Sequence, residues 1–192
     1  ELLSHGDELD LLIALDLDAG LGVIKLEGAG PWAAAALGKS TDVVTGARTG
    51  TVGVDEDNDL VQVTGAVHAI QPFSAYWEYM LDRALIVAPA SPQWGGSAVV
   101  NDRGEVVGIA SLRLGEAPHV NLAIPIEKFL PVKDELIRAG RIVSRPPRPW
   151  LGLYTVEVQG GVVVSETSPI GPAAAAGFLK GDRILRVNGV AV

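Results

Sequence analysis

Residues 95–109, GGSAVVNDRGEVVGI, decide the fold of this 192-residue chain because they combine two short apolar runs with one tight turn. Val99-Val100 and Val106–Ile109 consist largely of β-branched residues, which favour strands. Asn101–Gly104 lies between them and is typical of a turn that reverses the chain. The stretch therefore predicts a strand, a tight turn and a second strand.

The same pattern extends in both directions from this hairpin. Leu9–Ala14 and Gly22–Leu26 predict one strand pair, and Val43–Val54 with Leu60–Val67 predict another. Val120–Ile124 predicts one more strand. Because 23 Gly and 12 Pro separate apolar runs this short, the sequence predicts a fold that is mainly β.

An acidic run, Asp55–Asp59, lies between two of the predicted strands. It has two interpretations, a solvated hairpin tip or a calcium-binding loop. A dedicated calcium loop has alternating ligands and a central glycine, and this run has neither. The sequence therefore favours the solvated tip.

Composition limits the classes of function. Hydrophobic residues make up 48% of the chain and charged residues 20%, so a packed core is expected. The net charge of −8 argues against nucleic acid or an anionic membrane surface as a partner. Without cysteine there is no disulfide and no thiolate metal site. No apolar stretch is long enough to span a membrane.

A helix, a linker and a second domain are expected in the last third of the chain. Apolar residues at helical spacing predict a helix over Ile126–Ala139 that ends at Gly140. Three prolines within residues 144–149, SRPPRP, predict an extended linker. The expected domains are therefore residues 1–143 and 150–192. We expect the second to be partial, since no further strand or helix follows its last apolar run.

The second domain resembles the first half of a bacterial PDZ domain. Trp150–Leu153, Gly161–Val164 and Lys180–Gly189 carry the resemblance, together with a short helix expected around Pro172–Ala176 and closed by Gly177. The run Gly-Asp-x-Ile-Leu-x-Val-Asn-Gly is a specific motif, because a glycine turn must precede a buried strand that ends in another turn.

The first domain resembles the protease domain of HtrA/Deg-type trypsin-like serine proteases, in which a PDZ domain follows a similar linker. The matching stretches are Leu37–Gly46, Gly95-Gly96 followed by Asn101–Ile109, and Leu122–Pro125. The resemblance implies a mainly β fold, namely a trypsin-like double β-barrel with an incomplete N-terminal part followed by a partial PDZ domain. In such proteases His, Asp and Ser side chains converge in the cleft.

The sequence departs from this family at the catalytic positions. The nucleophilic serine of the family directly precedes a Gly-Gly pair, and here Trp94 precedes Gly95-Gly96. The catalytic aspartate precedes a strand that matches Leu21–Ile24, and here Gly20 stands in its place. The catalytic histidine belongs upstream of the matched region, so we expect its segment to precede Glu1 or to be missing.

These replacements predict a protease homologue without an intact catalytic triad, a pseudoprotease that binds proteins or peptides or acts as a scaffold. An indole cannot attack a carbonyl, and a glycine cannot orient an imidazole. The loop that forms the oxyanion pocket in the family corresponds to Gln93, Gly95 and Gly96. Pro92 and Gln93 replace the small residues that usually lead into it, so we expect a blocked site.

The alternative is an active HtrA-like serine endopeptidase. It would use Ser97 as a shifted nucleophile together with an upstream histidine. The shift would move the hydroxyl away from the oxyanion donors, so an ordinary serine at the start of a strand is the favoured interpretation. Asp16 and Asp18 are interpreted as turn residues rather than as a displaced catalytic aspartate.

The three histidines do not predict a further site. His5, His68 and His119 lie far apart along the chain and show no metal-ligand spacing, so no metal site is predicted. No cofactor is implied.

Trp150, Leu151, Gly152 and Leu153 match the PDZ loop that captures the carboxylate of a peptide C-terminus. The strand that follows such a loop receives the peptide as an added strand. The resemblance therefore implies protein or peptide C-termini as partners. It also implies a possible homotrimer and a periplasmic or otherwise exported location.

Overall fold

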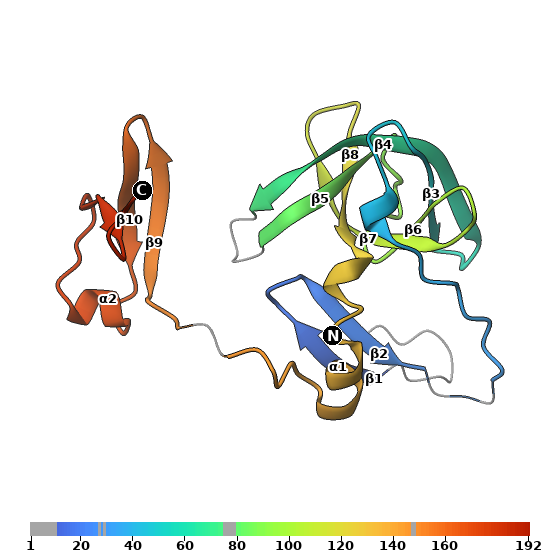
Figure 1. Ribbon diagram of the computed structural model, residues 1–192, viewed down its shortest axis with the longest axis horizontal. Coiled ribbons are helices and arrows are strands. Elements are labelled where there is room, and N and C mark those ends of the chain that lie inside the picture. Colours follow the sequence, from blue (N-terminus) through green and yellow to red (C-terminus); the bar gives the residue numbers. More distant parts are fainter. Residues whose placement is uncertain (1–10, 27, 29, 75–79, 147–148) are drawn as a thin grey trace. The chain divides into compact units, whose positions relative to one another are not determined.

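The computed structural model describes residues 11–26, 28, 30–74, 80–146 and 149–192 (Figure 1). The chain forms two compact units, residues 1–144 and residues 145–192. Strands dominate both units, so the mainly β prediction is confirmed.

A closed barrel of six antiparallel strands forms the centre of the first unit. The strands follow each other around the barrel in the order β3-β4-β5-β8-β7-β6, and β6 pairs with β3 to close it. Their bounds are β3 Arg48–Val54, β4 Leu60–Ser74, β5 Met80–Ala88, β6 Ala98–Val100, β7 Val106–Leu114 and β8 Val120–Pro125. Inward-facing aliphatic side chains such as Leu85, Val87 and Val107 are fully buried in it.

The hairpin predicted from residues 95–109 is β6–β7. The Oδ1 of Asn101 accepts the backbone N–H groups of Arg103 and Glu105 at 3.0 and 2.9 Å. Gly104 has a φ of 75°, which few residues other than glycine adopt without strain. The Asn at the start of the turn and the Gly at its end are thus the residues that make the reversal. The predicted pairs around residues 17–20 and 55–59 are also confirmed.

A separate two-stranded sheet precedes the barrel. It consists of β1 Leu11–Asp16 and β2 Leu21–Lys25, and α1 Lys133–Ala139 packs against β1 (Figure 1). Ala19 and Leu21, in and after the turn of this hairpin, are buried in one cluster with Ile86 and Leu122 of the barrel. The turn is therefore anchored on the barrel core.

The prediction of one helix over residues 126–139 was wrong in its first half. The structure has a short 3-10 helix, η2 Ile126–Lys128, and α1 begins only at Lys133. Pro131 explains the difference, because proline lacks an N–H donor and disfavours helical geometry in the residue before it. The predicted end is confirmed, since Gly140 closes α1 with a φ of 68° and donates its N–H to the Leu136 carbonyl at 3.0 Å.

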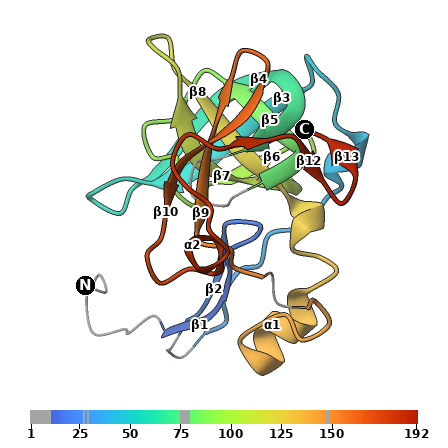
Figure 2. The ribbon, with the colours of Figure 1, turned by 90° about the vertical axis from the view of Figure 1, so that its left-hand side faces the viewer.

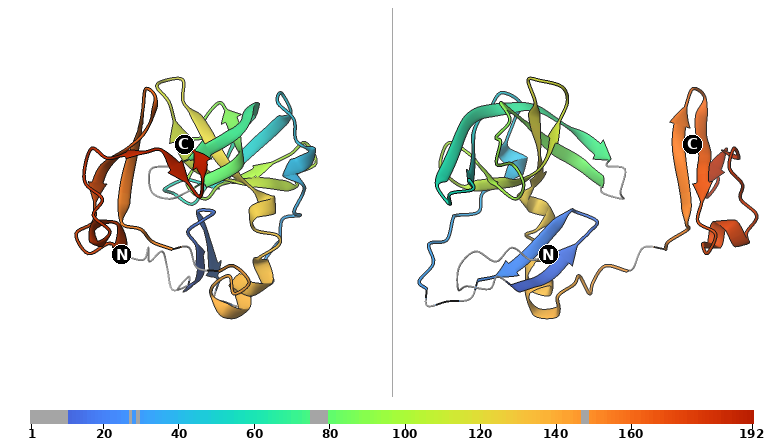
Figure 3. Two further views of the ribbon diagram at one scale, coloured as in Figure 1. Left: turned by 60° about the vertical axis from the view of Figure 1, so that its left-hand side comes forward. Right: turned by 180° about the vertical axis from the view of Figure 1, so that it is seen from behind.

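The second unit contains a three-stranded sheet in the order β11-β10-β9 and a small two-stranded sheet, β12-β13. The bounds are β9 Leu153–Val158, β10 Gly161–Thr167, α2 Pro172–Ala175, β11 Arg183–Ile184, β12 Arg186–Val187 and β13 Val190–Ala191. Helix α2 lies beside one end of the β9–β10 hairpin (Figures 2 and 3). The predicted short Ala-rich helix is confirmed, and Ala173 in it and Val164 on β10 are both buried.

Candidate functional site

Ser91–Ser97, termed the Trp94 loop, connects β5 to β6 and carries most of the predicted catalytic positions. Its start is fixed by Ser91, whose N–H donates to the Oδ1 of Asn121 on β8 at 2.7 Å. Both residues are fully buried. The side-chain amide of Asn121 thus replaces a backbone partner and holds the loop against the neighbouring strand.

The Gly-Gly pair makes the turn at the end of this loop. The N–H of Ser97 donates to the Trp94 carbonyl at 3.2 Å, and Gly96 has a φ of 83°. Two further bonds connect the turn to β7, from Gly96 N–H to the Ala110 carbonyl at 2.9 Å and from Ala110 N–H to the Ser97 carbonyl at 2.8 Å. The backbone on both sides of the turn is therefore fixed.

Trp94 is half-buried and contributes to the packing of the barrel. Its side chain contacts the buried cluster that includes Val67, Val87 and Val107. Burying part of the indole removes apolar surface from water and so stabilises the barrel. The indole has no hydroxyl oxygen that could act as a nucleophile. The residue at the predicted serine position therefore supports the fold and supplies no attacking group.

Ser97, the predicted alternative nucleophile, has a hydroxyl that is already engaged. Only 7% of the residue is exposed, and its Oγ donates to the backbone carbonyl of Gln93 within the same loop. A nucleophilic serine instead gives its proton to a general base such as an imidazole. In this geometry Ser97 stabilises the loop.

Pro92 has a chemical consequence beyond its bulk. In chymotrypsin-type proteases the oxyanion is bound by the N–H of the serine and by the N–H of the residue two positions earlier. The resemblance that places Trp94 at the serine position places Pro92 at that second donor. Proline has no backbone N–H, so position 92 cannot supply a donor of this kind. The missing N–H follows from the identity of residue 92 and can be predicted from the sequence.

Gly20, at the predicted aspartate position, lies in the turn between β1 and β2 with a φ of 70°. This backbone conformation favours glycine over residues with a side chain. Its neighbours Ala19 and Leu21 pack on the barrel core, and Asp16 at the end of β1 is 96% buried, with 4% of its surface exposed. The predicted catalytic positions therefore lie on two separate elements, Gly20 on the β1–β2 hairpin and Trp94 and Ser97 on the Trp94 loop.

A hollow of about 490 Å³, termed the Trp94 hollow, brings the predicted residues of that loop together. The structure thus places the predicted nucleophile position, the oxyanion-loop residues and the alternative serine around one cavity. Its lining consists of Val52, Gly53, Val54, Leu60, Pro92, Gln93, Trp94, Gly95, Gly96 and Ser97. None of these residues is charged.

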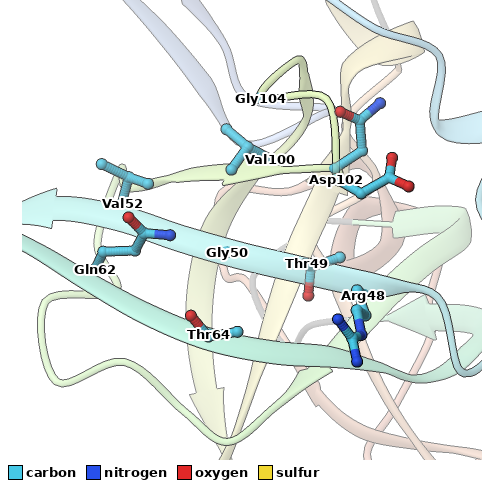
Figure 4. Close-up of a pocket in the computed structure, with 10 residues that line it drawn as sticks. Arg48, Thr49, Gly50, Val52, Gln62, Thr64, Val100, Asp102 and Gly104 are labelled. Carbon is cyan, nitrogen blue, oxygen red and sulfur yellow. The ribbon is translucent and has the colours of Figure 1, made fainter.

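A second hollow, of about 540 Å³, lies over β3 between β4 and β6 (Figure 4). Gly50 lines it at the middle of β3, flanked by Gln62 and Thr64 on β4 and by Val100 on β6. Its polar side chains come from β3, β4 and the β6–β7 turn, and it shares only Val52 with the Trp94 hollow.

The histidines do not complete a catalytic site in the described part of the chain. His5 lies outside the described residues. His68 is exposed on β4, and the Nδ1 of His119 lies 2.7 Å from the Gly115 carbonyl oxygen. Within the described ranges, no group of three potential metal ligands comes together.

The acidic run forms a turn that its own first residue holds. The Oδ1 of Asp55 accepts the N–H groups of Asp57 and Asp59 at 3.0 and 2.9 Å. Residues 56–59 are exposed. One carboxylate is thus used for local backbone bonding, as the solvated-tip interpretation requires.

Two carboxylates have a pKa below the usual range of glutamate, and both hold turns away from the Trp94 loop. The Asn101 amide at 2.8 Å and the Arg103 guanidinium lower the pKa of Glu105. The Ser144 hydroxyl at 2.6 Å and the N–H groups of Ser144 and Val143 lower that of Glu135. These shifts report local structure and not an acid–base pair.

The predicted carboxylate-binding loop of the second unit is held by backbone bonds. The carbonyls of Leu151 and Gly152 accept N–H groups from Ala173 and Ser168 at 2.9 and 2.8 Å. Gly152 has a φ of 65° and faces Gly171 so closely that a Cβ would lie 2.9 Å from the Gly171 Cα. The loop therefore has a fixed path into β9.

Strand β9 follows this loop and forms one edge of its sheet. It pairs with β10 on one side and with no other strand of the described chain. Most of its residues are exposed. Its free N–H and carbonyl groups can pair with an added strand.

Comparisons with known proteins agree with both units. The family model described as a trypsin-like peptidase domain matches residues 7–109, and the PDZ domain model matches residues 149–192. The "Serine endoprotease DegS" of Escherichia coli (strain K12) is 37% identical over 111 residues, which cover 48% of this chain and 30% of that protein.

A second relative extends over nearly the whole chain. The "Probable periplasmic serine endoprotease DegP-like" of Pseudomonas fluorescens is 30% identical over 196 residues, covering 93% of this chain and 39% of the relative. The chain thus spans less than half the length of these relatives.

Among solved structures, an "HtrA-type protease AlgW with decapeptide" superimposes with a TM-score of 0.68 at 24% identity, covering 96% of this chain and 60% of that one. The expected fold, a mainly β trypsin-like domain followed by a PDZ domain, is confirmed. No helix in the described residues has the length and apolar character to cross a membrane.

Proposed function

Because the chain belongs to the trypsin-like peptidase family and carries a PDZ domain in the arrangement of HtrA/Deg proteases, we propose that it binds polypeptides without cleaving them. The Trp94 loop carries this proposal. A side chain without a nucleophilic atom stands at the serine position, and it packs against the barrel core.

Two further features of the same loop support a non-catalytic role. Pro92 removes one of the two N–H donors that would stabilise an oxyanion, a loss that costs roughly 10²–10³ in rate when a single donor is deleted from an active enzyme. The hydroxyl of Ser97 donates to the Gln93 carbonyl. The loss of the nucleophile at Trp94 and the loss of an oxyanion donor at Pro92 are thus two separate obstacles to catalysis.

The test is incubation of the protein with unfolded casein and with a serine-directed fluorophosphonate probe. We expect neither cleavage nor labelling. Cleavage or labelling that disappears in the Ser97→Ala variant would establish the alternative, an active endopeptidase with a shifted nucleophile. Labelling that persists in Ser97→Ala would place a nucleophile elsewhere and would equally contradict the proposal.

The second unit is proposed to bind peptide C-termini through Trp150, Leu151, Gly152 and Leu153. The loop path is fixed by its bonds to Ser168 and Ala173, and the exposed edge of β9 follows directly. A peptide would place its carboxylate at the loop N–H groups and add as a strand to β9. Binding of an apolar peptide with a free carboxylate should therefore be lost when the same peptide is amidated.

The remaining family properties are proposed on resemblance. The proposed domains are residues 1–143 and 150–192, joined by the linker 144–149. The name of the Pseudomonas relative contains "periplasmic", which supports an exported location. A homotrimer is the expected assembly, and sedimentation of the intact protein with and without a PDZ ligand tests it.

A further inference from the structure

The Trp94 hollow has apolar walls, and two of its lining residues are largely exposed to solvent. Val54 and Leu60 face each other across the β3–β4 ladder at one side of it and are 56% and 74% exposed. Trp94 and Pro92 line it from the loop. Uncharged walls of this kind suit an apolar side chain, because burying it against them removes both surfaces from water.

The loop also offers hydrogen-bond donors that the protein itself does not use. None of the described residues accepts a hydrogen bond from the backbone N–H of Gln93, Trp94 or Gly95, whereas those of Gly96 and Ser97 are bonded. These three residues all line the hollow. Such N–H groups can bond to water in the free protein, and the carbonyls of a bound polypeptide segment can replace that water.

The acidic run adds charge at the rim of the hollow. Residues 55–59 directly connect Val54 to Leu60, so the acidic turn begins and ends beside two residues that line the hollow. Asp55 holds the turn, while Glu56, Asp57 and Asp59 are exposed and form no ion pair with a described residue. Their charge is thus available to a cationic partner.

We infer that the Trp94 hollow binds an extended polypeptide segment in which one apolar side chain is flanked by Lys or Arg. The apolar side chain contacts Val54, Leu60 and Trp94, the basic residues pair with the acidic rim, and carbonyls accept the free N–H groups of the loop. This inference rests on the proposed function, since the segment binds beside the position of the family nucleophile and is released intact.

The test uses the full chain with Trp32, Trp77 and Trp150 changed to Phe, so that Trp94 is the one remaining tryptophan. The probe is an acetylated and amidated peptide with the sequence Lys-Lys-Leu-Lys-Lys. Its blocked ends exclude capture of a terminal carboxylate by the second unit. We expect a saturable change in Trp94 emission, weakened about tenfold or more when Ala replaces the Leu. The peptide with Glu in place of Lys should not bind.

Matched variants locate the site. Leu60→Ser should weaken binding about tenfold, whereas Leu17→Ser should not, although the two leucines are 74% and 75% exposed. The double variant Glu56→Gln, Asp57→Asn keeps Asp55 and its turn, and it should weaken binding and flatten its dependence on salt.

Three outcomes would overturn the inference. These are no emission change with the lysine peptide, equal affinity in Leu60→Ser, or equal losses in Leu60→Ser and Leu17→Ser. Mass spectrometry of the recovered peptide separates the two proposals. Cleaved peptide contradicts the non-catalytic function, whereas intact peptide without binding contradicts only the occupant of the hollow.

Discussion

Gly53 on β3 and Ser97 in the Trp94 loop face each other with no space for another atom. A Cβ at position 53 would overlap the Ser97 Oγ and would lie 3.0 Å from the Gln93 carbonyl oxygen. The bond that holds the loop, from Ser97 to Gln93, therefore depends on a glycine in the neighbouring strand.

Gly53→Ala should accordingly destabilise the first unit by about 1–3 kcal/mol, the usual effect of overfilling a packed site. Urea unfolding measures it. Gly95→Ala is the control within the same loop, because a Cβ there meets no atom within 4 Å. Equal losses in the two variants would show that the contact with Ser97 is unimportant.

Trp94→Ser should fail to produce a protease and should cost stability. Removing a half-buried indole from the barrel cluster should lower the free energy of unfolding by about 2 kcal/mol, less than for a fully buried tryptophan. Fluorophosphonate labelling of the variant should stay at background, since Pro92 and Gly20 are unchanged. Trp32→Ser, at a residue that is 53% exposed, serves as the stability control. A labelled and stable Trp94→Ser variant would refute both expectations.

The segment after α1 should respond to pH through Glu135. Three hydrogen bonds from Val143 and Ser144 lower the pKa of this carboxyl, so the carboxylate form stabilises the folded segment. A depressed pKa means that this stabilisation is present above the ordinary glutamate pKa of about 4.3 and is lost as pH falls through the lower folded value.

Hydrogen exchange at the Val143 and Ser144 amides is the measurement for Glu135. Protection should be constant above about pH 5 and should fall at lower pH. In Glu135→Gln it should be weaker than in the unchanged protein above about pH 5 and should not change over this range. A pH response that survives in Glu135→Gln would assign it to another group.

Gly152→Ala should damage the peptide-binding loop more than a comparable change elsewhere in the second unit. Gly152 and Gly177 both have positive φ, 65° and 87°, so alanine strains the backbone at each by about 1 kcal/mol. Only at Gly152 would the Cβ also meet a neighbour, the Gly171 Cα at 2.9 Å. We expect loss of binding to a free C-terminal carboxylate in Gly152→Ala and near-normal binding in Gly177→Ala, measured by calorimetry. Equal binding in both would contradict the assigned role of the loop.

Local sequence was sufficient to predict the strands, because their β-branched runs and turn residues act over a few positions. Asn101 and Gly104 specify their turn by themselves. The helix prediction failed at Pro131, where apolar spacing outweighed a residue that interrupts a helix. The replacement at Trp94 could be found from the adjacent Gly-Gly pair.

Other features of the site depend on residues far apart in the chain and could not be predicted. The direction of the Trp94 indole depends on how strands from the whole barrel pack around it. The Ser97 hydroxyl is oriented by a carbonyl within its loop and confined by Gly53 of a strand more than 40 positions earlier. Only the folded chain brings these groups together.

The barrel and the sheet that contains β9 end differently, and this gives them different chemistry of recognition. Since the six-stranded barrel closes on itself, it offers no row of unpaired backbone groups to a foreign strand. Any ligand of the barrel must therefore be recognised by side chains and loops, which distinguish ligands by their size and charge. The free margin of β9 can instead pair with the main chain of a ligand whatever its sequence, so one protein can combine a selective contact with a tolerant one.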